Sequence, residues 1–280
     1  MADSPTLRVE HTDDASEALA ACGELLLGDP VAHNVALTIL GNRVAAPAPG
    51  RYWWVSDGDS VVGFAWQSPP AFKASVTPTS PDGARALADA MLADGADIPG
   101  VLGDAATAAA FTGRWTEQTG TGATVLEGQR IYRLDAVAEV PAASGSARPV
   151  DRGELPLLGT WADAFAAETG DTSVPDIEAA LLDLANRDLL WVWDDDGVAA
   201  MAKITDLRGG VVRVGLVYTP VDRRGAGYAT ALVADLSRHA LHAGADACIL
   251  YTQLGNAGSN RIYRRIGYRS VGEVLAYRFD

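Results

Sequence analysis

An internal repeat constrains the fold of this chain more than any other feature of its sequence. Residues 54–61 align with residues 191–198 without a gap, at an offset of 137 residues. Thr77-Pro78 aligns with Thr219-Pro220 at an offset of 142. The string Tyr-Arg-Leu-Asp at 132–135 aligns with Tyr-Arg-Phe-Asp at 277–280, at an offset of 145. Three matches at nearly constant offset predict two copies of one fold in tandem.

The two copies are separated by a short segment with the composition of a flexible linker. Residues 141–147 read Pro-Ala-Ala-Ser-Gly-Ser-Ala, without an apolar side chain large enough to anchor them. A chain of 280 residues is long enough for two domains that each bury a core. We therefore predict one domain over 1–143 and a second over 144–280.

The second copy alternates helical and extended patterns, which predicts an α/β fold with a mixed sheet. Apolar spacing indicates helices over 151–169 and 174–186, and β-branched or aromatic runs indicate strands over 189–193, 198–204 and 211–218. A helix over 230–241, a strand over 247–252, a helix over 256–266 and strands through 279 follow. The strand-helix-strand order across 211–252 predicts a parallel strand pair.

The segment 217–229 reads Val-Tyr-Thr-Pro-Val-Asp-Arg-Arg-Gly-Ala-Gly-Tyr-Ala, and it joins a strand to a helix. Such a junction aims backbone N–H groups and the positive end of a helix at one point, which suits a pyrophosphate. Gly225 and Gly227 let the backbone approach phosphates closely. The alternative is an ordinary strand-loop-helix joint with a surface arginine pair, and the full string favours an anion site.

At this point the chain resembles the GCN5-related N-acetyltransferases (GNAT). Arg224-Gly225-Ala226-Gly227-Tyr228-Ala229 fits the acetyl-CoA loop of that family, Gln/Arg-x-x-Gly-x-Gly/Ala. A second family element follows, with Asn256, a small residue three positions on, Tyr263, and then Gly267-Tyr268. The resemblance implies two tandem GNAT-like acyltransferase domains, acetyl-CoA as the acyl donor, and a strand pair that splays apart to admit the pantetheine arm.

The resemblance also implies roles for particular residues. The cofactor-binding residues would be Leu216, Val217 and Tyr218, whose backbone would pair with pantetheine, and Arg223, Arg224, Gly225, Ala226, Gly227 and Ala229, which would hold the pyrophosphate. A backbone N–H of the strand would receive the oxyanion. Asn256 would contact the cofactor or cap its helix. Tyr263 would be the catalytic acid that protonates the departing thiolate, or a tyrosine packed under the Gly267-Tyr268 turn.

The first copy lacks these features at the aligned positions. Asp82 stands opposite Arg224, and Arg85 stands opposite Gly227. An aspartate near a helix N-terminus occupies the place that an anion would take. Asp104 stands opposite Asn256, and Phe111 stands opposite Tyr263 but has no hydroxyl to donate a proton. We therefore expect residues 1–143 to form a degenerate, non-catalytic domain.

The general base is the least defined part of the predicted site. The strand before the glycine loop offers Arg213 and Gly215 but no carboxylate. Deprotonation of the acceptor would pass through water, or use Glu168 or Asp171. Three aromatic residues form either an apolar acceptor pocket or part of the core: Trp161, Phe165 and Trp193.

Charge and composition exclude several other classes of protein. The net charge is −14, which argues against binding to a nucleic-acid backbone. Residues 144–280 hold 14 basic and 18 acidic side chains, whereas 1–143 hold 8 and 18, so the less acidic half carries the anion site. No apolar run spans a membrane and residues 1–16 lack a signal-peptide core, so we expect a cytoplasmic protein. Cys22 and Cys248 predict buried thiols, and neither the cysteines nor the histidines form a metal motif.

Taken together, these features predict an N-acetyltransferase that uses acetyl-CoA and no metal. A small-molecule or peptide amine would attack the thioester directly in a ternary complex, because no activated Cys or Ser is evident. A homodimer is compatible with this prediction. The duplicated layout also resembles mycothiol synthase, which implies an amino sugar as an alternative acceptor. The alternative from another class is a non-catalytic acyl-CoA-binding sensor or assembly subunit.

Overall fold

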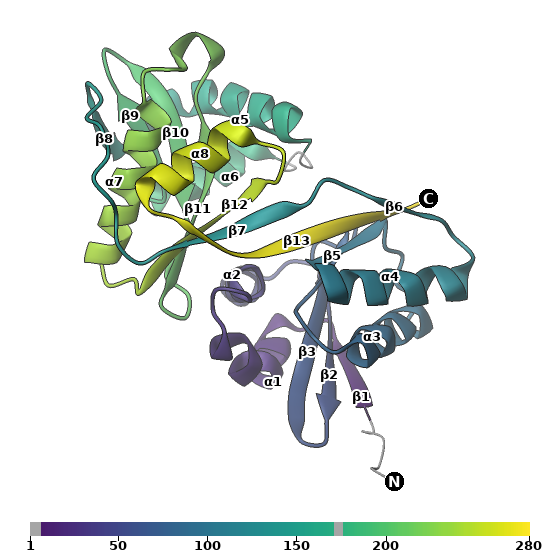
Figure 1. Ribbon diagram of the computed structural model, residues 1–280. Helices are drawn as coiled ribbons and strands as arrows, with labels where there is room; N and C mark the ends of the chain where they lie inside the picture. The colour runs from purple at the N-terminus through teal and green to yellow at the C-terminus, as the bar shows by residue number, and fades with distance from the viewer. Residues whose placement is uncertain (1–6, 171–175) are drawn as a thin grey trace. The chain divides into compact units, whose positions relative to one another are not determined.

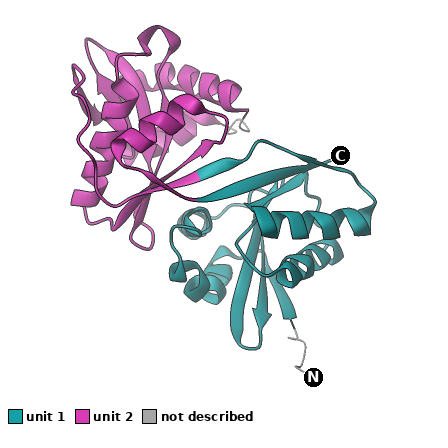
Figure 2. Ribbon diagram, in the orientation of Figure 1, with its two compact units in different colours: residues 1–130, 272–280 teal, residues 131–271 magenta. Residues whose placement is uncertain are grey.

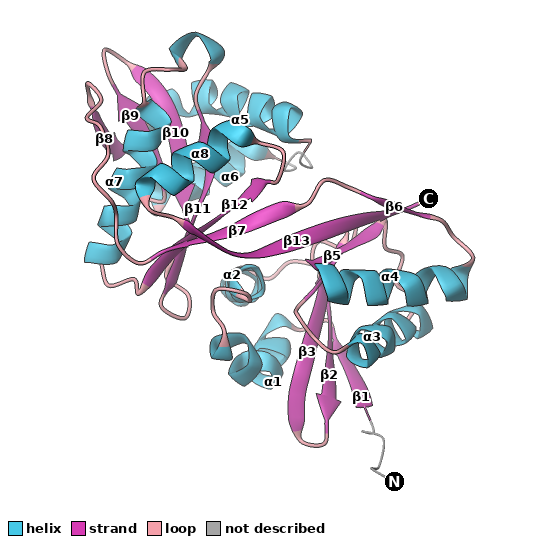
Figure 3. Cartoon of the chain, viewed as in Figure 1, coloured by secondary structure: helices cyan, strands magenta, loops and turns pink. Residues whose placement is uncertain are grey.

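The computed structural model describes residues 7–170 and 176–280. They divide into two compact units, one built from residues 1–130 and 272–280 and the other from residues 131–271 (Figures 1 and 2). Figure 3 shows that helices and strands alternate in both units. The mixed α/β class predicted from the sequence is confirmed.

The first unit contains a mixed sheet in the order β1-β2-β3-β4-β5-β13, with β6 also paired to β13. Only the step from β4 to β5 is parallel, at Ala74↔Val101 and Ser75↔Leu102. Its strands are β1 Leu7–Thr12, β2 Arg51–Asp57, β3 Ser60–Gln67, β4 Ala74–Val76, β5 Gly100–Asp104, β6 Ala123–Val125 and the end of β13 Arg269–Phe279. Its helices are α1 Ala15–Gly28, α2 Asn34–Ala45, α3 Pro81–Ala93 and α4 Ala105–Thr119.

The second unit repeats the same order of elements. Its sheet runs β8-β9-β10-β11-β12-β7, and the step from β11 to β12 is parallel. Its strands are β8 Ser146–Pro149, β9 Leu190–Asp194, β10 Val198–Ile204, β11 Val211–Tyr218, β12 Ala247–Gln253 and the end of β7 Gln129–Leu134. Its helical segments are η1 Arg152–Glu154, α5 Leu155–Thr169, α6 Ile177–Asn186, η2 Val221–Arg223, α7 Tyr228–His242 and α8 Ala257–Ile266.

The two copies exchange their last strands. β7 ends the first copy in sequence, but residues 131–134 belong to the second unit. β13 ends the second copy, but residues 272–280 belong to the first unit, where Val274 to Arg278 pair with β5. The units therefore differ from the predicted boundary at 143/144. Linker composition marks where regular structure stops, whereas strand membership depends on pairing between segments more than a hundred residues apart.

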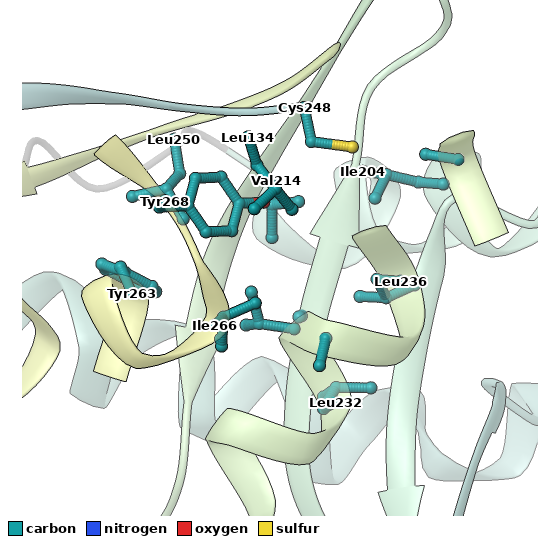
Figure 4. Close-up of a cluster of buried hydrophobic side chains, with 14 of the residues drawn as sticks. Leu134, Ile204, Val214, Leu232, Leu236, Cys248, Leu250, Tyr263, Ile266 and Tyr268 are labelled. Carbon is teal, nitrogen blue, oxygen red and sulfur yellow. The ribbon is translucent and has the colours of Figure 1, made fainter. Parts of the chain in front are cut away.

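Helix α7 covers one face of the second sheet and forms the centre of a buried cluster. Leu232 and Leu236 of α7 pack with Val214 of β11 and Leu250 of β12 (Figure 4). Leu134 of β7 joins the same cluster, so the exchanged strand contributes to this core. The alternation of β11 explains the packing, since Val212 and Val214 point toward α7 while Arg213 and Gly215 face the other way.

Local sequence signals place the ends of these helices. Ser80 caps α3 through the N–H of Gly83, and Pro81 supplies the first helical residue. Gly267 adopts a left-handed conformation at the end of α8, with φ of 109°. Helix α6 begins at Ile177, and the predicted start at residue 174 lies outside the described residues.

Candidate active site

The glycine loop lies between β11 and α7, where the sequence placed it. β11 ends at Tyr218, η2 makes one turn, and α7 begins at Tyr228. Gly225 and Gly227 both have φ of 91°, a conformation that side-chain-bearing residues rarely adopt. A Cβ built on either glycine would meet no other atom within 4 Å. The glycines are therefore required by backbone conformation, and the surface above the loop is open.

This loop presents backbone N–H groups that the described part of the chain does not use. The first hydrogen bond of α7 runs from the N–H of Ala231 to the carbonyl of Gly227. No side chain caps the helix. The N–H groups of Arg223 and Arg224 donate to Pro220 and Val221, but those of residues 225–230 have no acceptor among residues 7–170 and 176–280. The arrangement suits the oxygens of a pyrophosphate.

The side chain of Arg224 is held in place by contacts with neighbouring residues. Its Nε donates to the carbonyl of Thr219 at 2.8 Å, and its Nη2 donates to both carboxylate oxygens of Glu168 at 2.8 and 2.9 Å. The guanidinium also lies over the ring of Tyr218, 5.7 Å from its centroid. Arg224, which is proposed to bind the cofactor, is thus paired with Glu168, one of the two candidates for the general base. Asp171, the other candidate, lies outside the described residues.

The start of α7 is fixed by Tyr228. Its hydroxyl donates to Asp195, which lies in the β9–β10 turn and also accepts from the hydroxyl of Ser144 at 2.8 Å. These two hydrogen bonds hold the pKa of the Asp195 carboxyl below its ordinary value, and the charge of Arg223 lowers it further. The bond to Asp195 raises the pKa of Tyr228. Neither Tyr228 nor Asp195 was expected from the sequence to have a role of its own in the site.

β11 carries a β-bulge just before the loop. Met201 pairs with Tyr218 and Lys203 pairs with Gly215, so β11 has one residue more than β10 between these pairs. Leu216 lies within the bulge and has φ of 50°. The register with β12 runs from Val211↔Ala247 to Arg213↔Ile249, and both strands continue beyond it. Leu216, Val217 and Tyr218 therefore lie beyond the pairs that β11 forms with β12, although Tyr218 still pairs with Met201 of β10.

Helix α8 supplies the second motif. Asn256 is its N-cap, and its Oδ1 accepts from the N–H of Ser259 at 2.9 Å. Tyr263 is 6% exposed and packs in the cluster of Figure 4, with ring centroids 6.2 Å from Tyr132 and 6.1 Å from Tyr268. Burial raises the pKa of Tyr263 to about 12, which keeps its phenol protonated. Asn256 therefore makes the predicted cap, and the ring of Tyr263 makes the packing contacts of the structural alternative.

The structure separates the three aromatic residues of the predicted acceptor pocket. Trp193 is buried in the cluster with α7, and its Nε1 donates to the carbonyl of Ser144 at 2.7 Å. Trp161 and Phe165 are partly buried on α5, against a different cluster that contains Tyr218. Trp161 and Phe165 stay near the end of β11, whereas Trp193 belongs to the core.

The first unit shows what replaces the site in the other copy. Asp82 follows the cap of α3, and its carboxylate accepts from Arg85 at 2.7 Å. Asp104 caps α4 through the N–H groups of Ala106 and Thr107, as Asn256 caps α8. Phe111 is fully buried and stacks near Trp115.

Residues 157–268, which lie within the second unit, match the model of the family described as Acetyltransferase (GNAT) family, and this match supports an acyltransferase. GNAT proteins generally take the acyl group from acetyl-CoA. No functionally curated protein matches the chain in sequence.

Solved structures of GNAT proteins match nearly the whole chain. A GNAT-family acetyltransferase from Colwellia psychrerythraea is 14% identical with a TM-score of 0.62, and covers 98% of this chain and 100% of its own. A GCN5-related N-acetyltransferase from Sphaerobacter thermophilus is 16% identical with a TM-score of 0.63, over 97% and 95%. A tandem GNAT protein from the clavulanic acid biosynthesis pathway is 14% identical with a TM-score of 0.57, over 97% of each chain. At these identities the likeness shows the fold, and it extends over both units.

No three His, Cys, Asp or Glu side chains among residues 7–170 and 176–280 are arranged to hold a metal ion. No helix in those ranges is both long and apolar enough to cross a lipid bilayer.

Proposed function

We propose that the protein is an N-acetyltransferase that moves the acetyl group of acetyl-CoA to an amine, and that its second unit carries the activity. The observation that carries this proposal is the loop at Gly225 and Gly227, where two left-handed glycines and the start of α7 leave backbone donors without acceptors in the described part of the chain. A pyrophosphate would accept from these donors and lie at the positive end of the helix.

The bulged end of β11 supports the transfer step. The acyl-pantetheine arm would run along Leu216, Val217 and Tyr218, which lie beyond the pairs with β12, and would pair its amides with this side of the strand. The acceptor amine would attack the thioester carbon, and a backbone N–H of this segment would stabilise the oxyanion that forms. Collapse of the tetrahedral intermediate would release CoA as a thiolate, which takes up a proton.

Tyr263 is our candidate for the donor of that proton. Its pKa of about 12 keeps the phenol protonated, as an acid requires. Exchange of Tyr263 for Phe removes only the hydroxyl and leaves the ring contacts in place. We expect turnover to fall about 100-fold or more, with the Kd for acetyl-CoA changed less than twofold. Tyr268→Phe, in the same buried cluster, is the matched control for packing. Full turnover in Tyr263→Phe would assign the residue to the core.

Calorimetric titration with acetyl-CoA tests the proposal before any acceptor is known. We expect one site per chain, because the first copy has Asp82 and Arg85 where the loop has Arg224 and Gly227. A stoichiometry of two would contradict the non-catalytic assignment of the first unit. No binding over a range of temperatures would remove the basis for acetyl transfer.

An acyl-CoA-binding sensor or assembly subunit is the second candidate. The pairing of Glu168 with Arg224 favours it, because one base candidate is engaged. The two functions separate by experiment, since a sensor binds acetyl-CoA with the same stoichiometry but acetylates no member of an amine panel.

A further inference from the structure

Helix α7 begins without a capping side chain. Gly227 stands at its N-cap position, and no side chain of the described residues accepts from the N–H groups of the first turn. A capping side chain usually satisfies one of these donors and stabilises a helix by about 1 kcal/mol. At this loop, however, such a side chain would occupy the donors that we assign to the pyrophosphate. The start of α7 therefore needs an anchor that leaves its N–H groups open.

The side chain of Tyr228 makes a contact of this kind. Tyr228 is the first residue of α7, it is buried, and its hydroxyl donates to Oδ2 of Asp195 in the β9–β10 turn. The same oxygen accepts from the hydroxyl of Ser144 at 2.8 Å. Because the bond from α7 runs through a side chain, the backbone of residues 225–230 takes no part in it.

The segment before β8 holds Asp195 in turn. The carbonyl of Ser144 accepts from Nε1 of the buried Trp193 at 2.7 Å. Gly145 has φ of 89°, and a Cβ built there would lie 2.1 Å from the carbonyl oxygen of Asp194. This segment therefore lies against the end of β9. Through these contacts the start of α7 is linked to the core of the second unit.

The first copy of the repeat lacks both members of the pair. Gly58 stands opposite Asp195 at the offset of 137 residues, and Ala86 stands opposite Tyr228 at the offset of 142. Neither glycine nor alanine has a side chain that forms hydrogen bonds. Helix α3 nevertheless packs on the sheet of the first unit, and the side chain of Ser80 caps it. The pair is thus not needed to pack a helix on this kind of sheet, and it occurs in the copy that has the open glycine loop.

The charge of Asp195 does not explain its place beside an anion site. Hydrogen bonds from Tyr228 and Ser144 hold the pKa of its carboxyl below the ordinary value, and the charge of Arg223 lowers that pKa further. The carboxylate is therefore ionised at neutral pH and within electrostatic reach of the loop. A negative charge here would repel a pyrophosphate. What the carboxylate offers is a strong acceptor for the hydroxyl of Tyr228.

We propose that Asp195 is a positioning residue for the acyl donor: through Tyr228 it holds the first turn of α7 where the backbone of residues 225–230 receives the pyrophosphate. This proposal rests on the proposed function. Asp195 would touch neither the donor nor the reacting atoms. Loss of its hydrogen bond would let the first turn fray, because helix ends are the least stable part of a helix and this end has no cap among the described side chains.

The first experiment separates the hydrogen bond from the charge. Asp195→Asn keeps an oxygen that accepts from Tyr228 but removes the charge, whereas Asp195→Ala removes both. The Kd for acetyl-CoA, measured by calorimetry, should rise about 10-fold or more in Asp195→Ala and in Tyr228→Phe, as for a hydrogen bond to a charged group. It should stay within about threefold of the parent value in Asp195→Asn. An unchanged Kd in Asp195→Ala or Tyr228→Phe, or equal losses in Asp195→Ala and Asp195→Asn, would overturn the proposal.

The second experiment tests whether the two side chains act through one bond. The double variant Asp195→Ala/Tyr228→Phe should bind acetyl-CoA no more weakly than Tyr228→Phe alone. Tyr268→Phe is the matched control, because the Tyr268 hydroxyl is hydrogen-bonded to Ser237 of the same helix at 2.8 Å, nine residues after its start. We expect an unchanged Kd in this variant. Additive losses in the double variant, or an equal loss in Tyr268→Phe, would overturn the assignment to the start of α7.

A readout without ligand separates this proposal from the proposed function. The N–H of Ala231 donates to the carbonyl of Gly227 in the first turn, and its hydrogen exchange reports fraying there. Exchange should be about 10-fold faster in Tyr228→Phe and Asp195→Ala, and close to the parent rate in Asp195→Asn. Unchanged exchange in Asp195→Ala would overturn the anchor even if acetyl-CoA binds. Faster exchange in a protein whose parent form binds no acetyl-CoA would retain the anchor and reject the acetyltransferase.

Discussion

The phenol of Tyr132 donates a hydrogen bond to the Oδ1 of Asn260 over 2.9 Å, and both side chains are buried. The amide of Asn260 also donates to the carbonyls of Asn256 at 2.7 Å and Gln253 at 3.0 Å. Asn260 thereby joins the end of β12, the start of α8 and β7 through one side chain. Tyr132 comes from the first copy of the repeat and Asn260 from the second.

We expect Tyr132→Phe to lower the free energy of unfolding by about 1–3 kcal/mol, because it leaves a buried amide oxygen without a donor. Urea unfolding monitored by α-helical circular dichroism measures the change. Tyr277→Phe is the control, since Tyr277 is the repeat counterpart of Tyr132 and is only partly buried. If both variants lose the same free energy of unfolding, the loss comes from the surroundings of the ring and not from the hydrogen bond to Asn260.

Gly227→Ala should damage the loop in two ways. A residue with a side chain at φ of 91° costs about 1–2 kcal/mol, and its methyl group would stand over the backbone donors. We expect a loss of acetyl-CoA affinity of 10-fold or more by calorimetry. Gly113→Ala, in an exposed helical position of α4, should leave affinity unchanged and stabilise by up to about 1 kcal/mol. Unchanged affinity in Gly227→Ala would remove the loop from the cofactor site.

Glu168→Gln should release Arg224 toward the glycine loop. Both side chains are close to half exposed, so unfolding free energy should change by less than about 1 kcal/mol. Acetyl-CoA affinity should rise about two- to fivefold and depend more steeply on salt. Asp163→Asn removes an exposed carboxylate from the same helix without an ion pair among the described residues, and should change neither quantity. Tighter binding with lost turnover would identify Glu168 as the base.

The ion pair between Arg148 and Glu154 predicts a dependence of stability on pH. Hydrogen bonds from the Arg148 guanidinium lower the pKa of Glu154 below its usual 4.5. The folded pKa lies below the unfolded value, so this contribution is complete above pH 4.5 and is lost as pH falls through the lowered pKa. Glu154→Gln should therefore be less stable than the parent at pH 6, with a difference that shrinks toward pH 3.

Thermal unfolding across that range measures the effect. Glu24→Gln changes an exposed residue that has no ion pair among the described residues. Its difference in stability from the parent should be nearly constant across this pH range. If the difference in stability between Glu154→Gln and the parent also stays constant from pH 6 to pH 3, the ion pair with Arg148 does not contribute to stability.

Much of the second unit could be predicted from sequence, because its signals are local. β10 and β11 have the predicted bounds, and α7 extends the predicted helix by two residues at its start and one at its end. The glycine loop follows from residues that are contiguous. Asn256 could be named as cap or ligand because both roles depend on its position at a helix start.

The rest depends on contacts that no local pattern records. Leu216 in a left-handed bulge contradicts the β-branched run that predicts a regular strand, and β10 is needed to reveal the extra residue. The link between Arg224 and Glu168 joins residues 56 positions apart. Trp193 and Trp161 are chemically alike, but they pack in different buried clusters. Trp193 packs with α7, whereas Trp161 packs in the cluster that contains Tyr218.

The exchanged strands have a consequence for how this chain is made. A ribosome delivers residues from the N-terminus, and a domain usually folds once its own segment has emerged. Here the first unit receives residues 272–280 of β13 only after residues 131–271 have been translated, while the second unit uses a strand translated long before its glycine loop. The first unit is thus the first to be translated and the last to be completed, and a segment that holds either repeat alone lacks one strand of the unit to which most of it belongs.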